Sequence, residues 1–149
     1  FAWWGDDLIV VGQFTRAGDA AVSSIARWDG ETWSPIGDGN EGFYSFGPPL
    51  QLGGLAVQDN GLFVTGAFLG QTFPEGSDNT SVFNGVAWWN GTDFEPLSEG
   101  PNDLVEDVII TPDGHAAYIG GPFLRVDGEP SLGLARCEFD DLIGTPVER

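Results

Sequence analysis

The chain has 149 residues, enough for one domain with a hydrophobic core, and 13% of them are aromatic, so there is ample apolar mass to bury. It carries 23 acidic residues, five arginines and no lysine, for a net charge of −18, which excludes attraction to nucleic acid or anionic membranes because both attract cationic side chains. No apolar run approaches the roughly 18 residues of a membrane span, and the single cysteine excludes an intrachain disulfide.

The first quarter of the chain alternates short apolar stretches with turn signals. It begins with "FAWW" (1–4), turns at "WGDDL", and continues into a strand that ends in "VVGQF" (10–14). A third strand, "IARW" (25–28), leads through Asp29-Gly30 into a fourth that opens at Trp33. Both residues of the Asp-Gly dipeptide tolerate positive φ, so this stretch predicts a tight β-hairpin.

The same order of elements recurs twice more. "VTGAF" (64–68) and "IGGPF" (119–123) follow "VVGQF" at intervals of 54 and 55 residues. Each is followed by a third apolar stretch, so each unit is predicted to contain four short strands, close to the length of a propeller blade. We therefore expect an all-β, β-propeller-type fold of three four-stranded antiparallel blades in a single domain spanning 1–149. The expected blades cover about 1–49, 50–101 and 102–149.

Large aromatic residues lie where a blade would meet its neighbours. "AWW" occurs at 2–4 and again at 87–89, although a strand with one solvated face alternates apolar and polar residues. Such runs are typical of a sheet covered on both faces. We therefore expect seven aromatic residues to be mostly buried between sheets: Phe14, Trp28, Trp33, Phe68, Trp88, Trp89 and Phe123.

Arginines recur at matching places in the first and third units. Arg27 and Arg136 each lie thirteen positions after the phenylalanine that ends the second strand, and Arg16 corresponds to Arg125. A catalytic arginine is needed once rather than in every repeat, so we interpret these four as structural. Arg27 and Arg136 should contact a carboxylate or backbone carbonyls of the same or an adjacent blade.

The hairpins share one sequence pattern. "IARWDGETWSPIG" (25–37) shows it most fully, "VAWWNGTDFEPLS" (86–98) has Phe94 in place of the last tryptophan, and the third copy has Cys137 in place of a tryptophan and lacks the Asp-Gly turn. The pattern resembles kelch-type β-propeller repeats, in the form found in large bacterial secreted proteins and fungal cell-surface polarity markers. The resemblance covers nearly the whole chain and implies a repeat scaffold, usually for binding, with an enzymatic minority.

Propeller connectivity places the short turns at one end of the blades and the long loops, 37–54, 69–85 and 98–103, at the other. Long loops on a rigid scaffold often bind ligands, and aromatic side chains beside carboxylates suit sugar stacking or a protein partner. The alternative is that the aromatics fold their own loops onto the blades. The candidate binding residues are Asp38, Glu41, Phe43, Tyr44, Phe46, Phe73, Glu75 and Asp78, and the same end also carries Glu99 and Asp103.

The remaining residues with metal-binding or catalytic side chains do not form a recognisable site pattern. "DGNEG" (38–42) alternates oxygen ligands like the start of a calcium loop but lacks the later acidic positions, so we expect no cofactor, with calcium as the alternative. His115 lies beside the turn "TPDG" and is expected to be exposed rather than catalytic or metal-binding. Cys137 occupies an aromatic core position, which indicates a structural role.

These observations predict a non-enzymatic scaffold, extracellular or periplasmic and at the cell surface, that binds protein or glycan through its long loops. The alternative is a carbohydrate-active enzyme that uses two loop carboxylates, although one histidine and no lysine leave few catalytic groups. Neither nucleic acid nor membrane insertion is expected. A propeller needs four to eight blades to close, so the expected partners are other protein chains or further blades of the same protein. They should meet Phe1, Trp3 or Trp4, and residues 139–147.

Overall fold

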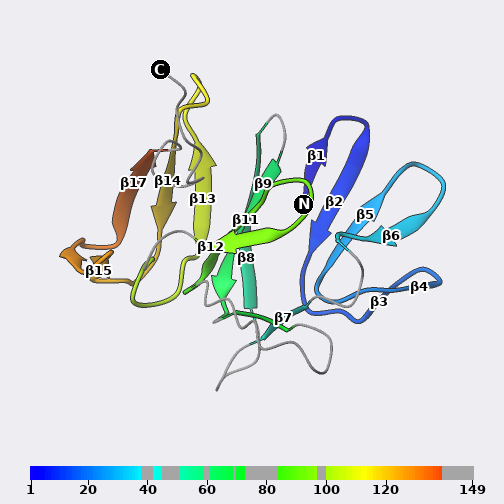
Figure 1. Ribbon diagram of the computed structural model, residues 1–149, viewed down its shortest axis with the longest axis horizontal. Coiled ribbons are helices and arrows are strands. Elements are labelled where there is room, and N and C mark those ends of the chain that lie inside the picture. Colours follow the sequence, from blue (N-terminus) through cyan, green and yellow to red (C-terminus); the bar gives the residue numbers. More distant parts are fainter. Residues whose placement is uncertain are drawn as a thin grey trace.

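The computed structural model describes residues 1–37, 42–44, 51–58, 61–68, 70–72, 84–96 and 100–138. Over these residues the protein is all-β, built from antiparallel sheets without any helix (Figure 1). Consequently, none of the described segments is a helix that could cross a membrane. The predicted all-β class is confirmed.

Three sheets each follow the chain order of their strands. The first contains β1 (Ala2–Trp4), β2 (Asp7–Val11), β5 (Ile25–Trp28) and β6 (Trp33–Pro35). The second contains β8 (Gln51–Gln58), β9 (Gly61–Ala67), β11 (Val86–Trp89) and β12 (Phe94–Pro96). The third contains β13 (Asp107–Ile110), β14 (Ala116–Gly120) and β17 (Leu134–Glu138), and the stretch in which we expected a fourth strand lies outside the described residues.

Three small two-stranded ladders accompany these sheets. Two are hairpins inserted between the second and third strands of the first and third sheets, and the other joins two distant loops. They are β3 (Arg16–Ala17) with β4 (Ala20–Ala21), β15 (Arg125–Val126) with β16 (Glu129–Pro130), and β7 (Gly42–Tyr44) with β10 (Gly70–Thr72).

The three sheets repeat one another residue by residue. In the central strand pairs, Trp28 lies opposite Leu8, Trp89 opposite Leu62 and Cys137 opposite Ala117. A residue with left-handed backbone precedes the third strand each time, and its N–H donates to the carbonyl of the phenylalanine that follows the second strand. These donor residues are Ser24 (φ +65°), Gly85 (φ +82°) and Gly133 (φ +79°), with N···O distances of 2.9, 2.9 and 3.0 Å. The repeat found in the sequence is therefore a repeat in backbone geometry.

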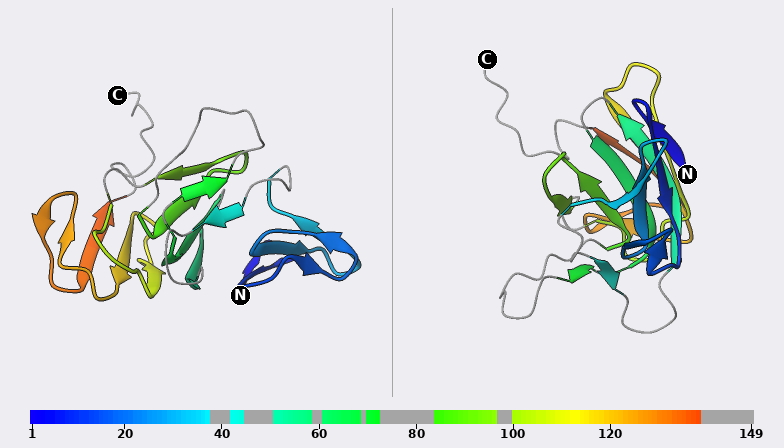
Figure 2. Two further views of the ribbon diagram at one scale, coloured as in Figure 1. Left: turned by 90° about the horizontal axis from the view of Figure 1, so that it is seen from below. Right: turned by 90° about the vertical axis from the view of Figure 1, so that its right-hand side faces the viewer.

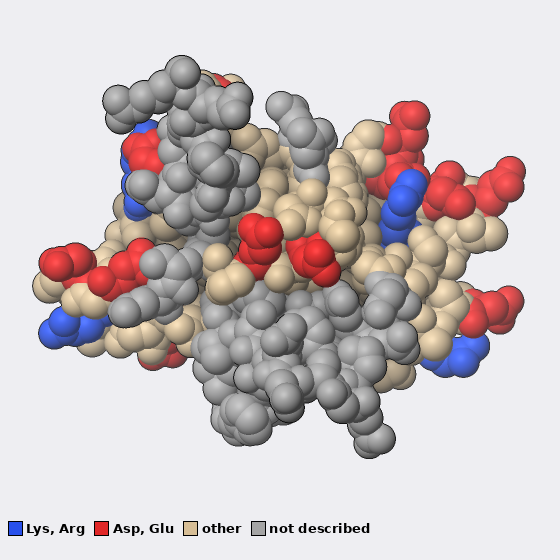
Figure 3. Space-filling model, in the orientation of Figure 1, with Lys and Arg blue, Asp and Glu red and all other residues tan. Residues whose placement is uncertain are grey.

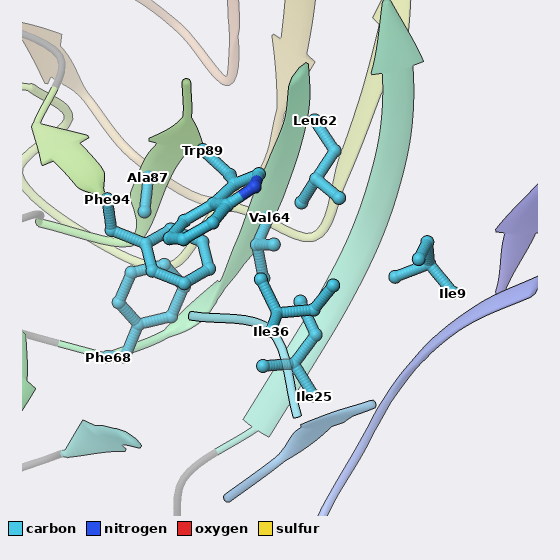
Figure 4. Close-up of a cluster of buried hydrophobic side chains, with 9 residues drawn as sticks. All are labelled: Ile9, Ile25, Ile36, Leu62, Val64, Phe68, Ala87, Trp89 and Phe94. Atoms are coloured by element: carbon cyan, nitrogen blue, oxygen red, sulfur yellow. The ribbon is translucent and has the colours of Figure 1, made fainter. Parts of the chain in front are cut away.

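The second sheet is packed between the other two (Figure 2). Trp89 lies on the side that faces the first sheet, where it packs in a cluster with Ile9, Ile25 and Ile36 (Figure 4). Trp88, the adjacent residue, lies in the cluster that faces the third sheet with Val108 and Ile119. Successive side chains of a strand point to opposite faces, so the run "AWW" at 87–89 serves two interfaces, as predicted.

The first strands of the three sheets lie next to one another, with β8 in contact with β1 on one side and β13 on the other. The approach of β8 to β13 is close enough to require glycine. A Cβ placed on Gly53 would lie 2.5 Å from the carbonyl oxygen of Glu106, and one on Gly54 would lie 2.9 Å from the amide nitrogen of Val108. The glycine pair in "GGLAV" is explained by this contact.

The predicted burial of aromatic residues is confirmed for Phe68, Trp88, Trp89 and Phe123. It is met only in part by Phe14, Trp28 and Trp33, which are half-buried. Trp28 and Trp33 lie in the first sheet and Phe14 follows its second strand, and the equivalents of all three in the second unit are buried against the first sheet. No described residues form a sheet on that side of the first one, so the same positions stay partly open to solvent.

The hairpins at Asp29-Gly30 and Asn90-Gly91 form as predicted, although not as two-residue turns. Trp28 pairs with Trp33, which leaves a four-residue loop, and only the glycines have positive φ, +99° in each. The Asp29 side chain accepts hydrogen bonds from the N–H groups of residues 31 and 32, and Asn90 accepts the equivalent pair from residues 92 and 93. These bonds hold the pKa of the Asp29 carboxyl below its usual value.

The four repeated arginines contact carboxylates or backbone carbonyls, as predicted for Arg27 and Arg136. Arg16 and Arg125 donate to the carbonyl three residues further on in equivalent hairpins, at 3.1 and 2.8 Å. Arg27 forms an ion pair with Asp7 on the neighbouring strand, and Arg136 forms one with Glu138 on its own strand. The pairing differs because Ala116 occupies the position equivalent to Asp7.

Candidate functional site

Described segments of two predicted binding loops, β7 and β10, lie at one end of the sheets, below them in Figure 1. There β7 pairs with β10 so that Phe43 lies opposite Gln71 and Tyr44 opposite Gly70. This ladder joins the loop that follows the first sheet to the loop inside the second. For Phe43 and Tyr44 the structure describes the backbone alone. The remaining candidates lie outside the described residues: Asp38, Glu41, Phe46, Phe73, Glu75 and Asp78, together with the calcium alternative at 38–42 and Glu99.

A pocket of about 650 Å³ opens near the tight turns, where the first strands of the three sheets end. The turn after β1 contributes Trp4 and Gly5, the end of β8 contributes Val57 and Gln58, and the β13–β14 turn contributes residues 110–115. This pocket was not predicted from the sequence. The sequence indicates only that each unit has a turn after its first strand. It does not show how closely the first strands of neighbouring units approach one another, and the pocket depends on that distance.

The polar groups of the pocket are held by hydrogen bonds within the protein. Asp113 accepts hydrogen bonds from the Thr111 hydroxyl and from the backbone N–H of His115, and these bonds hold the pKa of its carboxyl below the usual value. The Gln58 side-chain amide donates to the carbonyl oxygen of Gly114 at 2.6 Å, which ties the third sheet's turn to the second sheet. His115 is exposed, as predicted. Asp113 is therefore an anionic acceptor rather than a proton donor near neutral pH.

The side of the first sheet that points away from the second sheet is apolar and partly exposed. We call it the leading face and define it by Trp3, Leu8, Val10, Trp28 and Trp33. Trp3, Leu8, Trp28 and Trp33 lie opposite one another in a row across the four strands. Trp3 is 65% exposed, and the other members are half-buried. Phe1, just before β1, is also exposed.

The side of the third sheet that points away from the second sheet carries exposed apolar side chains beside the Arg136–Glu138 ion pair. We call it the trailing face and define it by Ile109, Tyr118 and Leu134, which are 66%, 38% and 64% exposed. Of the residues expected to meet a partner, Phe1 and Trp3 are exposed. Trp4, the alternative to Trp3, points inward and packs against the cluster between the first and second sheets. Residues 139–147 lie outside the described part.

Cys137 lies in the cluster between the second and third sheets, at the position occupied by Trp28 and Trp89 in the other sheets. Burial, with a smaller contribution from the charge of Asp127, raises the pKa of the thiol to about 11. A thiol that stays protonated near neutral pH is a poor nucleophile. The geometry agrees with the predicted structural role.

Acidic side chains are spread over the face shown in Figure 3 rather than gathered in one patch. Among the described residues no group of three or more His, Cys, Asp or Glu side chains could hold a metal ion. Comparison with protein-family models, with curated proteins and with solved structures found no match.

Proposed function

We propose that this protein is a non-enzymatic scaffold of the β-propeller type whose blades are kelch-like repeats. Three observations support the proposal. The sheets repeat one register and one left-handed position, they stack through buried aromatic residues, and their first strands lie side by side. The third sheet would then gain its fourth strand from the residues that follow 138. Further blades would come from the same protein or from other protein chains.

The proposed task of the scaffold is to bind a protein or a glycan through its long loops, outside the cell or in the periplasm. The observation that carries this is the β7–β10 ladder, because it fixes the backbone of Phe43 and Tyr44 against a second long loop. Aromatic rings held on a fixed backbone can stack on sugars at a low cost in conformational entropy. The net charge of −18 would disfavour acidic glycans and favour neutral ones or cationic proteins.

A glycan array probed with the labelled chain tests this function. We expect binding to neutral glycans that Phe43→Ala and Tyr44→Ala each weaken about tenfold or more, because stacking on one ring contributes about 1–2 kcal/mol. His115→Ala is the matched control, since His115 lines the pocket at the opposite end. If His115→Ala abolishes glycan binding while Phe43→Ala and Tyr44→Ala retain it, the glycan binds in that pocket and not at the loops. No glycan binding by the wild-type chain would leave a protein ligand as the proposed class.

The rival, a carbohydrate-active enzyme, depends on loop carboxylates, of which Asp103 lies among the described residues. Glycoside hydrolysis requires one carboxylic acid that is protonated at working pH. Asp113, the carboxylate in the described lining of the pocket, has a lowered pKa and is therefore unsuited to that role. We place the enzyme second for this reason.

A further inference from the structure

We propose that the leading face of one copy of this chain binds the trailing face of a second copy, in a head-to-tail interface that repeats the packing between the first and second sheets. This proposal goes beyond ligand binding by the loops, and it concerns residues at the two outer sides of the sheet stack. It rests on the internal repeat, since the protein already contains one example of the interface that the two exposed faces would form.

The leading face is equivalent to a surface that is buried inside the protein. Each residue of its row has a counterpart in the second sheet at the same pairing position, and every counterpart packs in the cluster against the first sheet. The aromatic pair is even arranged alike, because the rings of Trp28 and Trp33 lie 5.1 Å apart at 43° and their counterparts lie 4.9 Å apart at 54°. The row of Trp3, Leu8, Trp28 and Trp33 corresponds to Val57, Leu62, Trp89 and Phe94.

The trailing face is equivalent to the surface that receives that row. In the first sheet, Ile9 and Ile25 form part of the cluster against which Trp89 packs, and both are fully buried. The pairing register places Tyr118 and Leu134 at the same positions in the third sheet, where they are exposed. Large apolar side chains thus occupy the positions of Ile9 and Ile25, whereas Gly120 occupies the position of Val11.

The leading and trailing faces carry different side chains, and this difference determines which face of one copy packs on which face of the other. An interface between two leading faces would bring one aromatic row against another, an arrangement with no example in this protein. Packing of a leading face on a trailing face reproduces the contact between the first and second sheets. Such an interface is heterologous, so it can close into a ring or continue into a longer assembly.

The net charge of the chain makes the proposed association depend on salt concentration. Each copy carries a net charge of −18, so two copies repel each other at low ionic strength, whereas apolar burial drives their association. Salt screens the repulsion without weakening the apolar contact. Association should therefore strengthen as salt concentration rises.

Sedimentation velocity of the 149-residue chain over a wide range of concentration tests the proposal. We expect reversible self-association that Trp3→Arg and Leu134→Arg each weaken about a hundredfold or more, because each places a charge at an apolar contact. Both side chains are mostly exposed, so the two variants should keep the wild-type circular dichroism spectrum and melting temperature when dilute. His115→Ala is the control variant, and it should associate like the wild type.

Mixing the two variants distinguishes head-to-tail packing from the other modes. The Trp3→Arg variant retains its trailing face, and the Leu134→Arg variant retains its leading face. Each variant alone should stay monomeric, and an equimolar mixture should form a heterodimer through the one intact pair of faces. A wild-type chain that stays monomeric at all concentrations and salt levels would overturn the proposal. Self-association of the Leu134→Arg variant alone would also overturn it, because leading faces would then bind one another. A mixture that fails to associate would have the same consequence.

Discussion

Replacing Trp89 by alanine should destabilise the protein far more than replacing Trp28 by alanine. The two tryptophans occupy the same repeat position, each opposite a leucine on one side and an aromatic residue on the other. They differ in whether a second sheet packs on the face from which the tryptophan projects. Trp89 is 4% exposed in the cluster between two sheets, whereas Trp28 is half-buried on the leading face.

The size of the effect follows from the buried area. A buried tryptophan removes roughly 200 Å² from water, which at about 25 cal/mol per Å² stabilises the fold by about 5 kcal/mol, and alanine retains a small part of this. We therefore expect Trp89→Ala to lower the free energy of unfolding by about 3–5 kcal/mol. Trp28→Ala in dilute, monomeric protein should cost about half as much or less, since much of its ring already contacts water.

Urea unfolding of both variants, followed by circular dichroism at low protein concentration, measures the difference. At high concentration the cost of Trp28→Ala should rise toward that of Trp89→Ala, because association would bury Trp28 in the wild type. Equal costs in dilute protein would refute the reasoning, since the leading face would then be covered within a single chain.

Further substitutions and titrations test local features. Ser24→Gly should stabilise the protein by about 0.5–1 kcal/mol, because Ser24 holds a left-handed backbone that glycine adopts more easily, while Gly133→Ser should cost about 1–3 kcal/mol; thermal unfolding measures both. The Cys137 thiol, with its pKa near 11, should react slowly with Ellman's reagent at pH 8, and stability should decline as pH rises from about 9, the unfolded value, through about 11. The Asp29 carboxyl should titrate below 3.8 in an NMR experiment, and its contribution to stability should be present above that pH and lost as pH falls through the lower, folded value. Asp29→Asn should change little at neutral pH, because Asn90 accepts the same hydrogen bonds in the second hairpin.

The strand arrangement could be predicted from the sequence because its signals are local. Turn dipeptides and the recurring Gly-x-Phe motif set the strand order, and the equal spacing from Phe14 to Arg27 and from Phe123 to Arg136 fixed the register. The double burial of the second sheet followed from adjacent tryptophans, since neighbouring residues of a strand face opposite ways.

The burial of individual residues could not be predicted in the same way, because it depends on what packs on each sheet. Trp28 and Trp89 have equivalent local sequences, and only the position of their sheets in the stack separates them. The pocket beside His115 was missed for a related reason. It depends on how closely β8 approaches β1 and β13, a distance set by tertiary packing and by glycines such as Gly53.

Nuclear Overhauser effects from the two adjacent indoles of the second sheet test the stacking of repeated sheets most directly. The account predicts that Trp89 ring protons show contacts to methyl groups of Ile9, Ile25 or Ile36 in the first sheet, and that Trp88 ring protons show contacts to methyl groups of Val108 or Ile119 in the third. Contacts from both indoles to the same sheet, or from neither to a neighbouring sheet, would contradict it.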